Sequence, residues 1–152
     1  MLELQRETLE QIHTHAKAEF PDECCGVLLS DGAQEFVRTC KNIQNERHAA
    51  DPETYPRDAR TAYLIDPIDL IKVHKEAETE NRQIKAFYHS HPNHDAYFSE
   101  KDKADAMAWD EPMYPEAAYI VISIYAQEIR VTRAYAWSET AADFVEIPIK
   151  ER

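Results

Sequence analysis

Glycine is scarce in this chain, and its scarcity excludes several kinds of site. Only two of the 152 residues are glycine, Gly26 and Gly32. A loop that cradles phosphate groups needs several glycines, because its backbone N–H groups must approach the ligand closely. The composition therefore argues against a nucleotide-binding loop and against a fold made mainly of tight β-turns.

Cysteines and long apolar runs are also in short supply. Cys24, Cys25 and Cys40 are an odd number of cysteines without a C-x-x-C pair, which argues against a disulfide framework. No segment approaches the roughly 20 apolar residues of a membrane-spanning helix. The first residues also lack the basic and then apolar pattern of a secretion signal. We therefore expect a cytoplasmic protein in a reducing compartment.

Positively charged residues are also scarce relative to acidic ones. The chain has 17 lysines and arginines against 29 aspartates and glutamates, which gives a net charge of −12. Such a surface repels phosphate groups, so neither nucleic acid nor an anionic membrane is expected as a partner. An acidic surface serves solubility, and it is also common in proteins from a high-salt cytoplasm. Neither interpretation identifies a substrate.

The residues that are present suffice for one globular domain over residues 1–152. Hydrophobic residues make up 43% of the chain and aromatic residues 10%, which is enough for a single core. The apolar pattern predicts helices over 2–20, 67–80 and 99–109, a polar loop over 41–60, and strands over 24–29, 35–40, 62–65, 84–88, 117–125, 128–135 and 144–150. Because helices and strands are interleaved, we expect an α/β or α+β domain with a mixed sheet flanked by helices.

The most informative segment is His89-Ser90-His91-Pro92 together with the Ser99 and Asp102 that follow it. His89 and His91 lie at the end of a predicted strand, where alternation sends both imidazoles to one face, about 6.6 Å apart. Ser99 and Asp102 have the spacing of a helix cap and the third helical residue, which places the carboxylate at the positive end of a helix. Two imidazoles and one carboxylate leave a fourth position for water, as in an open, catalytic zinc site.

Each half of this pattern also has an ordinary structural interpretation. A histidine pair on a strand is more often surface or core histidine than a metal ligand, and S-x-x-D is usually a capping box. The two halves together, with Pro92 ending the strand, favour a metal site. Two other folds with an H-x-H motif are excluded. Amidohydrolase barrels need a longer chain, and cupins are all-β with several glycines in the motif.

The arrangement resembles the JAMM (MPN-plus) metalloproteases. The segment from His89 to Asp102 is similar to the signature of that family. The segment Pro21-Asp22-Glu23-Cys24-Cys25-Gly26-Val27-Leu28 is similar to its proline, glutamate, cysteine, glycine and leucine pattern. The resemblance covers residues 5–135 and looks closest to the small bacterial members that stand alone. It implies a cytidine-deaminase-like JAB/MPN domain with a mixed, partly curled sheet.

The resemblance also implies a role for each site residue. His89, His91 and Asp102 would hold one zinc ion per chain. Glu23 would act as the general base that moves a proton from water to the leaving amine. Ser99 would donate a hydrogen bond to the oxyanion. Spacing alone does not select Glu23, because it lies far from His89 in the sequence.

The function implied by the resemblance is zinc-dependent hydrolysis of a peptide or isopeptide bond. Small bacterial members are associated with ubiquitin-like sulfur-carrier proteins, whose flexible Gly-Gly tail suits a narrow groove. We therefore expect removal of an amino acid or extension from such a tail, by analogy. The alternative is a non-catalytic, zinc-binding MPN scaffold or interaction domain. Family members often pair, so a homodimer also stays open.

Several other residues have lower priority. His94 and Asp95 follow the histidine pair and could line the substrate groove or support the metal ligands, although a solvated loop is the ordinary interpretation. His74 lies on an apolar helix face and is expected to be partly buried and hydrogen-bonded. Cys25 lies in an apolar strand without a basic activator, so we expect a structural role. Tyr97 and Phe98 are expected to form an apolar lip beside the groove.

Overall fold

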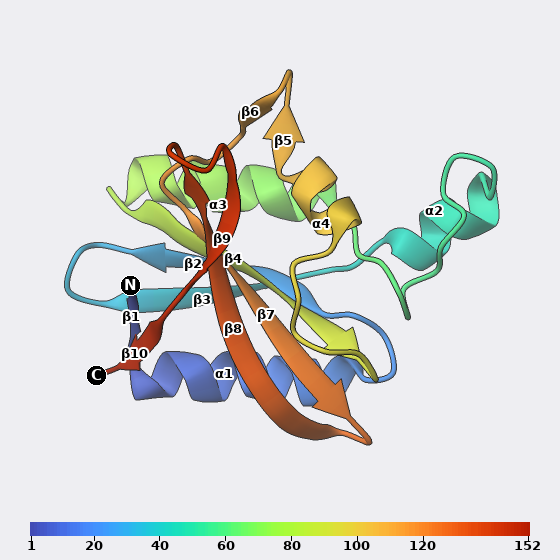
Figure 1. The fold of residues 1–152 in the computed structure, drawn as a ribbon, viewed down its shortest axis with the longest axis horizontal. Helices are drawn as coiled ribbons and strands as arrows, with labels where there is room; N and C mark the ends of the chain where they lie inside the picture. Colours follow the sequence, from blue (N-terminus) through green and yellow to red (C-terminus); the bar gives the residue numbers. More distant parts are fainter.

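A six-stranded mixed sheet forms the centre of the protein (Figure 1). The computed structural model describes residues 1–152. The helices are α1 (Arg6–Glu19), α2 (Gln44–Ala50), α3 (Pro67–Thr79) and α4 (Glu100–Asp105). The strands are β1 (Leu2–Leu4), β2 (Cys25–Ser30), β3 (Glu35–Cys40), β4 (Gln83–Pro92), β5 (Met107–Ala108), β6 (Glu111–Pro112), β7 (Ala118–Tyr125), β8 (Glu128–Ser138), β9 (Asp143–Ile147) and β10 (Ile149–Glu151). None of the helices is long and apolar enough to cross a bilayer.

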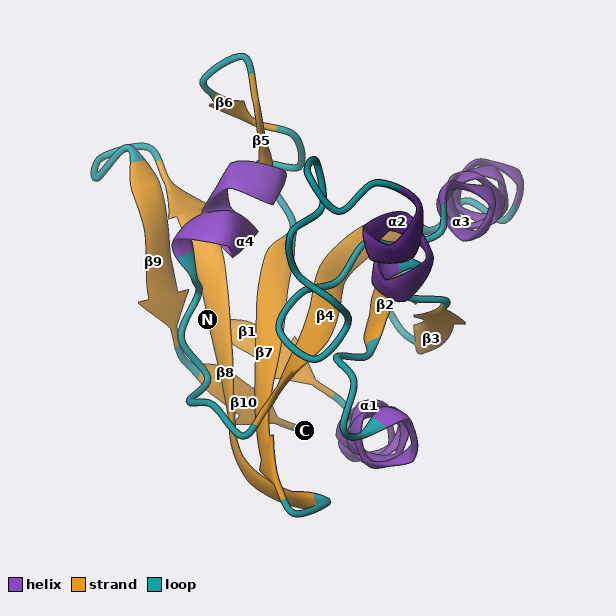
Figure 2. Cartoon of the chain, turned by 90° about the vertical axis from the view of Figure 1, so that its right-hand side faces the viewer, coloured by secondary structure: helices purple, strands orange, loops and turns teal.

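The sheet has the strand order β3-β2-β4-β7-β8-β9, and only its central β4–β7 pair is parallel. Two smaller sheets accompany it. Strands β1 and β10 form a parallel pair that joins the two ends of the chain. Strands β5 and β6 form a hairpin that stands beyond α4 (Figure 2). The predicted mixed sheet with flanking helices is confirmed.

Two apolar clusters fill the space between the sheet and its helices. One cluster joins α1 to the sheet and includes Ile12 and Ile120. The other joins α3 to the opposite face and includes Val73 and Val121. The consecutive residues Ile120 and Val121 belong to different clusters because side chains alternate along a strand. Both faces of the central strands are therefore buried.

Strand β4 contributes side chains to both clusters and carries the two histidines near its end. Tyr88 is buried in the α1 cluster, whereas Phe87 is buried in the α3 cluster. By the same alternation, His89 and His91 project to the α3 side, together with Phe87. Their ring nitrogens approach to 3.0 Å, which confirms that the two imidazoles share one face of the strand.

Two predicted helix starts are confirmed by their caps. The Asp66 carboxylate accepts the N–H of Ile68 at 2.9 Å, and proline occupies the first position of α3. At the start of α4, Ser99 Oγ accepts the N–H of Asp102 at 3.0 Å. These caps satisfy backbone donors that a helix start otherwise leaves unpaired.

The predictions for the two ends of the chain are wrong in detail. Leu2 and Leu4 do not begin a helix, because they are buried in strand β1, which pairs with β10. Burial at every second residue is the pattern of a strand. The single strand expected over 144–150 is divided at Pro148 into β9 and β10. Proline has no N–H to donate to the ladder, so pairing is interrupted there.

Three predictions in the middle of the chain are also wrong. The stretch 41–60 is not a uniform loop, because it contains α2, whose mostly polar residues gave no apolar period. The strand expected over 62–65 is reduced to one bridge between Asn42 and Ile65. The helix expected over 99–109 ends at Asp105, and the β5–β6 hairpin follows it. Trp109 and Asp110 turn this hairpin with positive φ angles of 55° and 64°, which no helix accommodates.

Gly26 is required by the close approach of β2 and β4. It is paired with Tyr88 in the antiparallel register, and a Cβ atom at this position would overlap the Tyr88 ring. Tyr88 is 1% exposed, and its hydroxyl lies 2.7 Å from Nδ1 of His15. The ring therefore has little freedom to move aside.

The substitution Gly26→Ala is expected to lower the free energy of unfolding by about 1–3 kcal/mol, the usual cost of overpacking a core. Urea denaturation followed by circular dichroism measures this loss. In a double-mutant cycle with Tyr88→Leu, the two losses should be less than additive, because the smaller side chain removes the overlap. An unchanged unfolding midpoint for Gly26→Ala would contradict the predicted overlap.

Candidate metal centre

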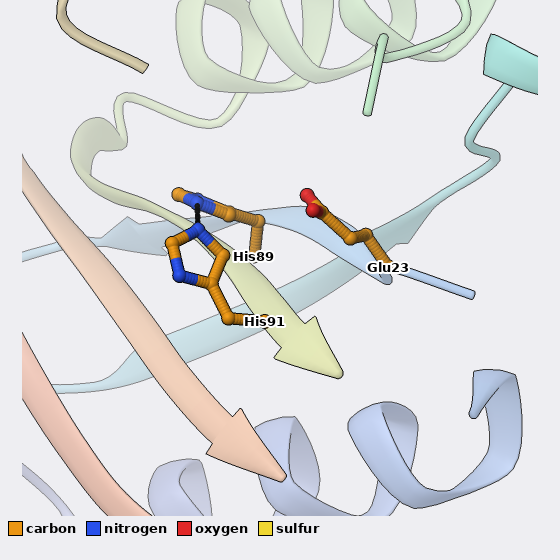
Figure 3. A group of neighbouring side chains, drawn as sticks. All are labelled: Glu23, His89 and His91. Atoms are coloured by element: carbon orange, nitrogen blue, oxygen red, sulfur yellow. Dashed lines mark hydrogen bonds between the residues drawn. The ribbon is translucent and has the colours of Figure 1, made fainter. Parts of the chain in front are cut away.

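Two imidazoles meet near the end of β4. Nε2 of His89 and Nε2 of His91 are 3.0 Å apart, and both side chains are buried. Figure 3 shows the two rings with these nitrogens turned toward each other, and the side chain of Glu23 extending toward them from a neighbouring segment. The strand end therefore presents two nitrogen donors to one point.

Asp102 supplies a third converging atom. Its Oδ2 lies 3.1 Å from Nε2 of His89 and 3.3 Å from Nε2 of His91. Ligand atoms at the corners of a zinc tetrahedron are about 3.3–3.4 Å apart, given zinc–ligand distances of about 2.0–2.1 Å. The three atoms form a triangle close to that size. Two imidazoles and one carboxylate are also the donor types that zinc prefers, so these residues fit a zinc ion.

The start of α4 fixes the Asp102 carboxylate. The Ser99 N–H donates to Oδ2 of Asp102 at 3.0 Å, which completes a reciprocal capping box. Burial opposes ionisation of this carboxyl, but the adjacent His89 and His91 outweigh burial, and the pKa of Asp102 is lowered. The carboxylate is therefore ionised at neutral pH, as a metal ligand must be.

Neighbouring groups orient the two imidazoles. Nδ1 of His91 lies 2.8 Å from the carbonyl oxygen of Asp95, and an N–H donated to that oxygen directs the lone pair of Nε2 toward the centre. The ring of His89 stacks on Tyr63, with the ring centroids 4.5 Å apart. Burial lowers the pKa of His89 more than the charge of Asp102 raises it. This ring is therefore held neutral, in the form that binds metals.

Glu23 lies two residues before β2 and is 5% exposed. Its N–H donates to the carbonyl of Ala59 at 2.7 Å, and its own carbonyl accepts a hydrogen bond from Asn42 Nδ2 at 2.9 Å. A carboxylate oxygen of Glu23 and a ring nitrogen each of His89 and His91 all lie within 4.8 Å of one another. Glu23 forms no hydrogen bond with either imidazole, so it lies outside the triangle formed by the two ring nitrogens and the Asp102 oxygen.

The surroundings of Glu23 favour its protonated form. Burial, followed by the negative charge of Asp102, raises the pKa of Glu23 to about 9, while the positive charges of Lys101 and Arg57 act in the opposite direction. At neutral pH such a carboxyl group holds a proton that it can deliver as a general acid, and a cation bound nearby would favour the ionised form that a general base requires. The structure thus brings Glu23, His89, His91 and Asp102 into one buried space.

A pocket of about 340 Å³ opens beside these groups. It is lined by Glu23, Arg57, Thr61, His91, His94, Tyr97, Ser99 and Asp102. Because Ser99 Oγ accepts the N–H of Asp102, its hydroxyl hydrogen remains free to donate into the pocket. A larger cavity of about 1030 Å³ lies near the two ends of the chain, but neither histidine nor cysteine lines it.

The lower-priority residues have mixed outcomes. Tyr97 is 50% exposed and lines the pocket as predicted, whereas Phe98 is buried in the core and forms no lip. His94 lines the pocket and the Asp95 carbonyl supports His91, which are the two alternatives to a solvated loop. His74 is exposed, not partly buried, and its Nε2 lies 2.8 Å from a tyrosine hydroxyl. Burial raises the pKa of Cys25 well above that of a free thiol, which agrees with a structural role.

Two pocket residues, Arg57 and Thr61, were missed by the sequence reasoning. Both lie in the segment that connects α2 to the Asn42–Ile65 bridge. No spacing rule connects this segment to the H-x-H motif. Its position is set by long-range hydrogen bonds, such as that between the Glu23 N–H and the Ala59 carbonyl. Only the tertiary structure reveals such contacts.

The chain is similar in sequence to several known proteins. The family described as prokaryotic homologs of the JAB domain matches residues 5–138. A desampylase from Haloferax volcanii is 29% identical over 152 residues, which cover 97% of this chain and 94% of that protein. A "Probable TtuB-protein conjugate cleaving protease" from Thermus thermophilus is 36% identical over 112 residues, or 74% of this chain and 67% of that protein. A CysO-cysteine peptidase from Mycobacterium tuberculosis is 27% identical over 135 residues, or 89% of this chain and 82% of that protein.

Solved structures share the fold. A protein from Desulfitobacterium hafniense has a TM-score of 0.73 at 22% identity and covers 100% of this chain and 93% of its own. A JAB1/MPN domain protein from Archaeoglobus fulgidus has a TM-score of 0.52 at 16% identity, with 99% of this chain and 100% of its own covered. The family match covers most of the chain and agrees with the resemblance found in the sequence. This protein therefore belongs to the prokaryotic homologs of the JAB domain.

Proposed function

We propose that this chain is a zinc-dependent peptidase or isopeptidase in which His89, His91 and Asp102 hold one zinc ion. One observation carries the proposal. Two ring nitrogens and one carboxylate oxygen lie 3.0, 3.1 and 3.3 Å from one another in a buried site beside a pocket. Nδ1 of His91 is engaged by a carbonyl, which leaves Nε2 of that ring turned toward the Asp102 carboxylate and available to a shared cation.

The proposed hydrolysis requires a bound metal ion and a group that transfers protons. A bound zinc ion supplies Lewis acidity, which polarises a carbonyl group and makes water a stronger nucleophile near neutral pH. Glu23 takes a proton from the attacking water and later delivers it to the leaving amine. Its burial and its place in the pocket suit a group that passes protons to and from bound groups once a nearby cation lowers its pKa. Its position within 4.8 Å of both imidazoles places it beside the reacting atoms.

Ser99 stabilises the charge that develops during the attack. Its Oγ accepts the Asp102 N–H, which leaves its hydroxyl hydrogen available for a group in the pocket. A carbonyl oxygen that gains negative charge in the pocket accepts this hydrogen bond. Ser99 therefore orients a metal ligand through its backbone N–H and supports the transition state through its hydroxyl.

The pocket suits a narrow substrate segment. Its volume of about 340 Å³ holds a few small residues but no folded domain. We propose as substrate a ubiquitin-like sulfur-carrier protein whose flexible Gly-Gly tail enters the pocket and loses an adduct there. The names of the relatives, which include a CysO-cysteine peptidase and a TtuB-conjugate protease, support this class. A cytoplasmic location is consistent with three buried cysteines that form no disulfide.

The metal assignment makes a direct prediction. The wild-type protein should bind about one zinc ion per chain, and His91→Ala should bind far less, because one corner of the triangle is lost. At zinc concentrations 100-fold above Kd, binding should add about 2.7 kcal/mol to the free energy of unfolding of the wild type. Elemental analysis and thermal denaturation measure both effects.

The control for this experiment is His74→Ala, since His74 is exposed on α3 and bonded only to a tyrosine hydroxyl. It should keep the full zinc content. Equal zinc content in His91→Ala and the wild type would refute the ligand assignment.

The function is tested with a carrier protein extended by a few residues beyond its Gly-Gly end. The zinc-loaded wild type should release the carrier ending in Gly-Gly, which mass spectrometry detects. Glu23→Gln should retain zinc and lose roughly 10²- to 10⁴-fold in kcat, because the amide cannot take up the proton. A zinc-loaded wild type that cleaves no carrier would instead favour the non-catalytic scaffold. Full activity of Glu23→Gln would exclude Glu23 as the base.

Removal of the Ser99 hydroxyl should be visible in two measurements. Ser99→Ala is expected to lower kcat by roughly 10- to 10³-fold, because a donor to the oxyanion is lost. It should also lower the free energy of unfolding by about 1 kcal/mol through the lost cap. Ser99→Thr keeps both the cap and the hydroxyl and should stay near the wild type. If Ser99→Ala keeps the wild-type kcat, Ser99 has no role in the reaction.

A further inference from the structure

Arg57 is the only lysine or arginine among the residues that line the candidate site. Its guanidinium has no carboxylate partner in the chain, and its one hydrogen bond is a long contact of 3.5 Å to the Thr61 carbonyl. The arginines that form ion pairs are Arg6, Arg38, Arg82, Arg133 and Arg152. In a chain with 29 acidic residues, an unpaired guanidinium beside a pocket is available for an anion from outside.

The backbone around Arg57 is held in place although its side chain is exposed. The Arg57 carbonyl accepts a hydrogen bond from Nε2 of the buried Gln44 at 2.9 Å. Two residues later, the Ala59 N–H donates to Asn45 Oδ1 at 2.8 Å. The Ala59 carbonyl in turn accepts the Glu23 N–H at 2.7 Å. The segment that contains Arg57 is therefore hydrogen-bonded directly to the segment that contains Glu23.

Arg57 also lies close enough to Glu23 for its charge to act on that carboxyl group. Lys101 acts on Glu23 as well, but its ammonium is paired with Asp105 at 2.6 Å and it does not line the pocket. Only Arg57 therefore combines proximity to Glu23, a place in the pocket and a free guanidinium.

The leaving nitrogen of an amide must reach Glu23 to receive its proton. When the leaving group is a single amino acid, its carboxylate is attached to the same carbon as this nitrogen, so its oxygens lie within about 4 Å of it. When the leaving group is a lysine side chain, methylene groups occupy that place. When it is a longer peptide, a neutral carbonyl does. A guanidinium beside Glu23 favours the first of these three, because a bidentate contact to a carboxylate is much stronger.

We propose that Arg57 binds the free α-carboxylate of the leaving group, so that this protein releases single C-terminal amino acids from the carrier tail in preference to lysine conjugates. The inference rests on the proposed function and narrows it. The step is a hydrolysis. The terminal C–N bond breaks, the oxygen of water bonds to the carbonyl carbon, and a proton passes through Glu23 to the nitrogen of the departing amino acid.

The experiment compares three substrates built on one carrier protein ending in Gly-Gly. The first carries one further alanine with a free carboxylate, the second carries the same alanine as its amide, and the third is joined to the Nε of a lysine in a short peptide. The zinc-loaded wild type, Arg57→Ala, Arg57→Lys and the control Arg60→Ala are assayed on each. Arg60 lies in the same segment but does not line the pocket.

The wild type and Arg60→Ala should cleave the carboxylate substrate at least about tenfold faster than its amide, measured as kcat/KM. Arg57→Ala should lose this preference by slowing the carboxylate substrate much more than the other two. Arg57→Lys should keep part of it, because the charge remains and the fork is lost.

Two results would overturn the inference alone: a wild type that cleaves without preferring the carboxylate, or an Arg57→Ala protein that slows all three substrates equally. The latter would mean that Arg57 only supports Glu23. Failure of the zinc-loaded wild type to cleave any of the three would overturn the proposed function, and the inference with it.

Discussion

The convergence of three electron-pair donors on one point is the constraint on which this site depends. Two imidazole nitrogens and a carboxylate oxygen lie 3.0–3.3 Å apart, and the backbone is what brings these three atoms from two separate elements to one point. Alternation along β4 sends both rings to one face, and the capping box of α4 aims the carboxylate. Strand alternation and the capping box are both features of regular secondary structure, so the three donor atoms are in position before any ion binds. Preorganisation of this kind lowers the cost of binding a metal.

The parts of the site that obey local rules could be predicted from the sequence. His89, His91, Ser99 and Asp102 lie within a short segment, and the periods of a strand and a helix start decide where their side chains point. Glu23 did not follow from any such rule and entered only through a family resemblance. Its place depends on the register that pairs β2 with β4 and on hydrogen bonds between distant segments, which local patterns do not encode.

Local sequence patterns also predicted part of the fold, and the errors in that prediction have physical causes. Three elements with a clear apolar period, α3, β2 and β7, were predicted to within one residue of their observed bounds, whereas α1 begins four residues later and β4 ends four residues later than predicted. The short or polar elements were not found. Helix α2 buries too few apolar side chains to show a period, and β1 is held by its pairing with β10 at the other end of the chain. Arg57 was missed for the same reason, because the segment after α2 is ordered by contacts with Gln44 and Asn45.

The net charge of −12 excludes extended polyanions but does not exclude a small anion from this pocket. At physiological ionic strength the Debye length is about 8 Å, so the scattered surface carboxylates are largely screened from a group inside the pocket. The groups that line the pocket decide the local field, and among them Arg57 is the only lysine or arginine. The global composition thus governs which large partners approach, whereas a single guanidinium on an anchored segment governs which leaving group is favoured. The metal donors lie on rigid elements and the selecting cation lies on a connecting segment, so selectivity can change without disturbing the metal centre.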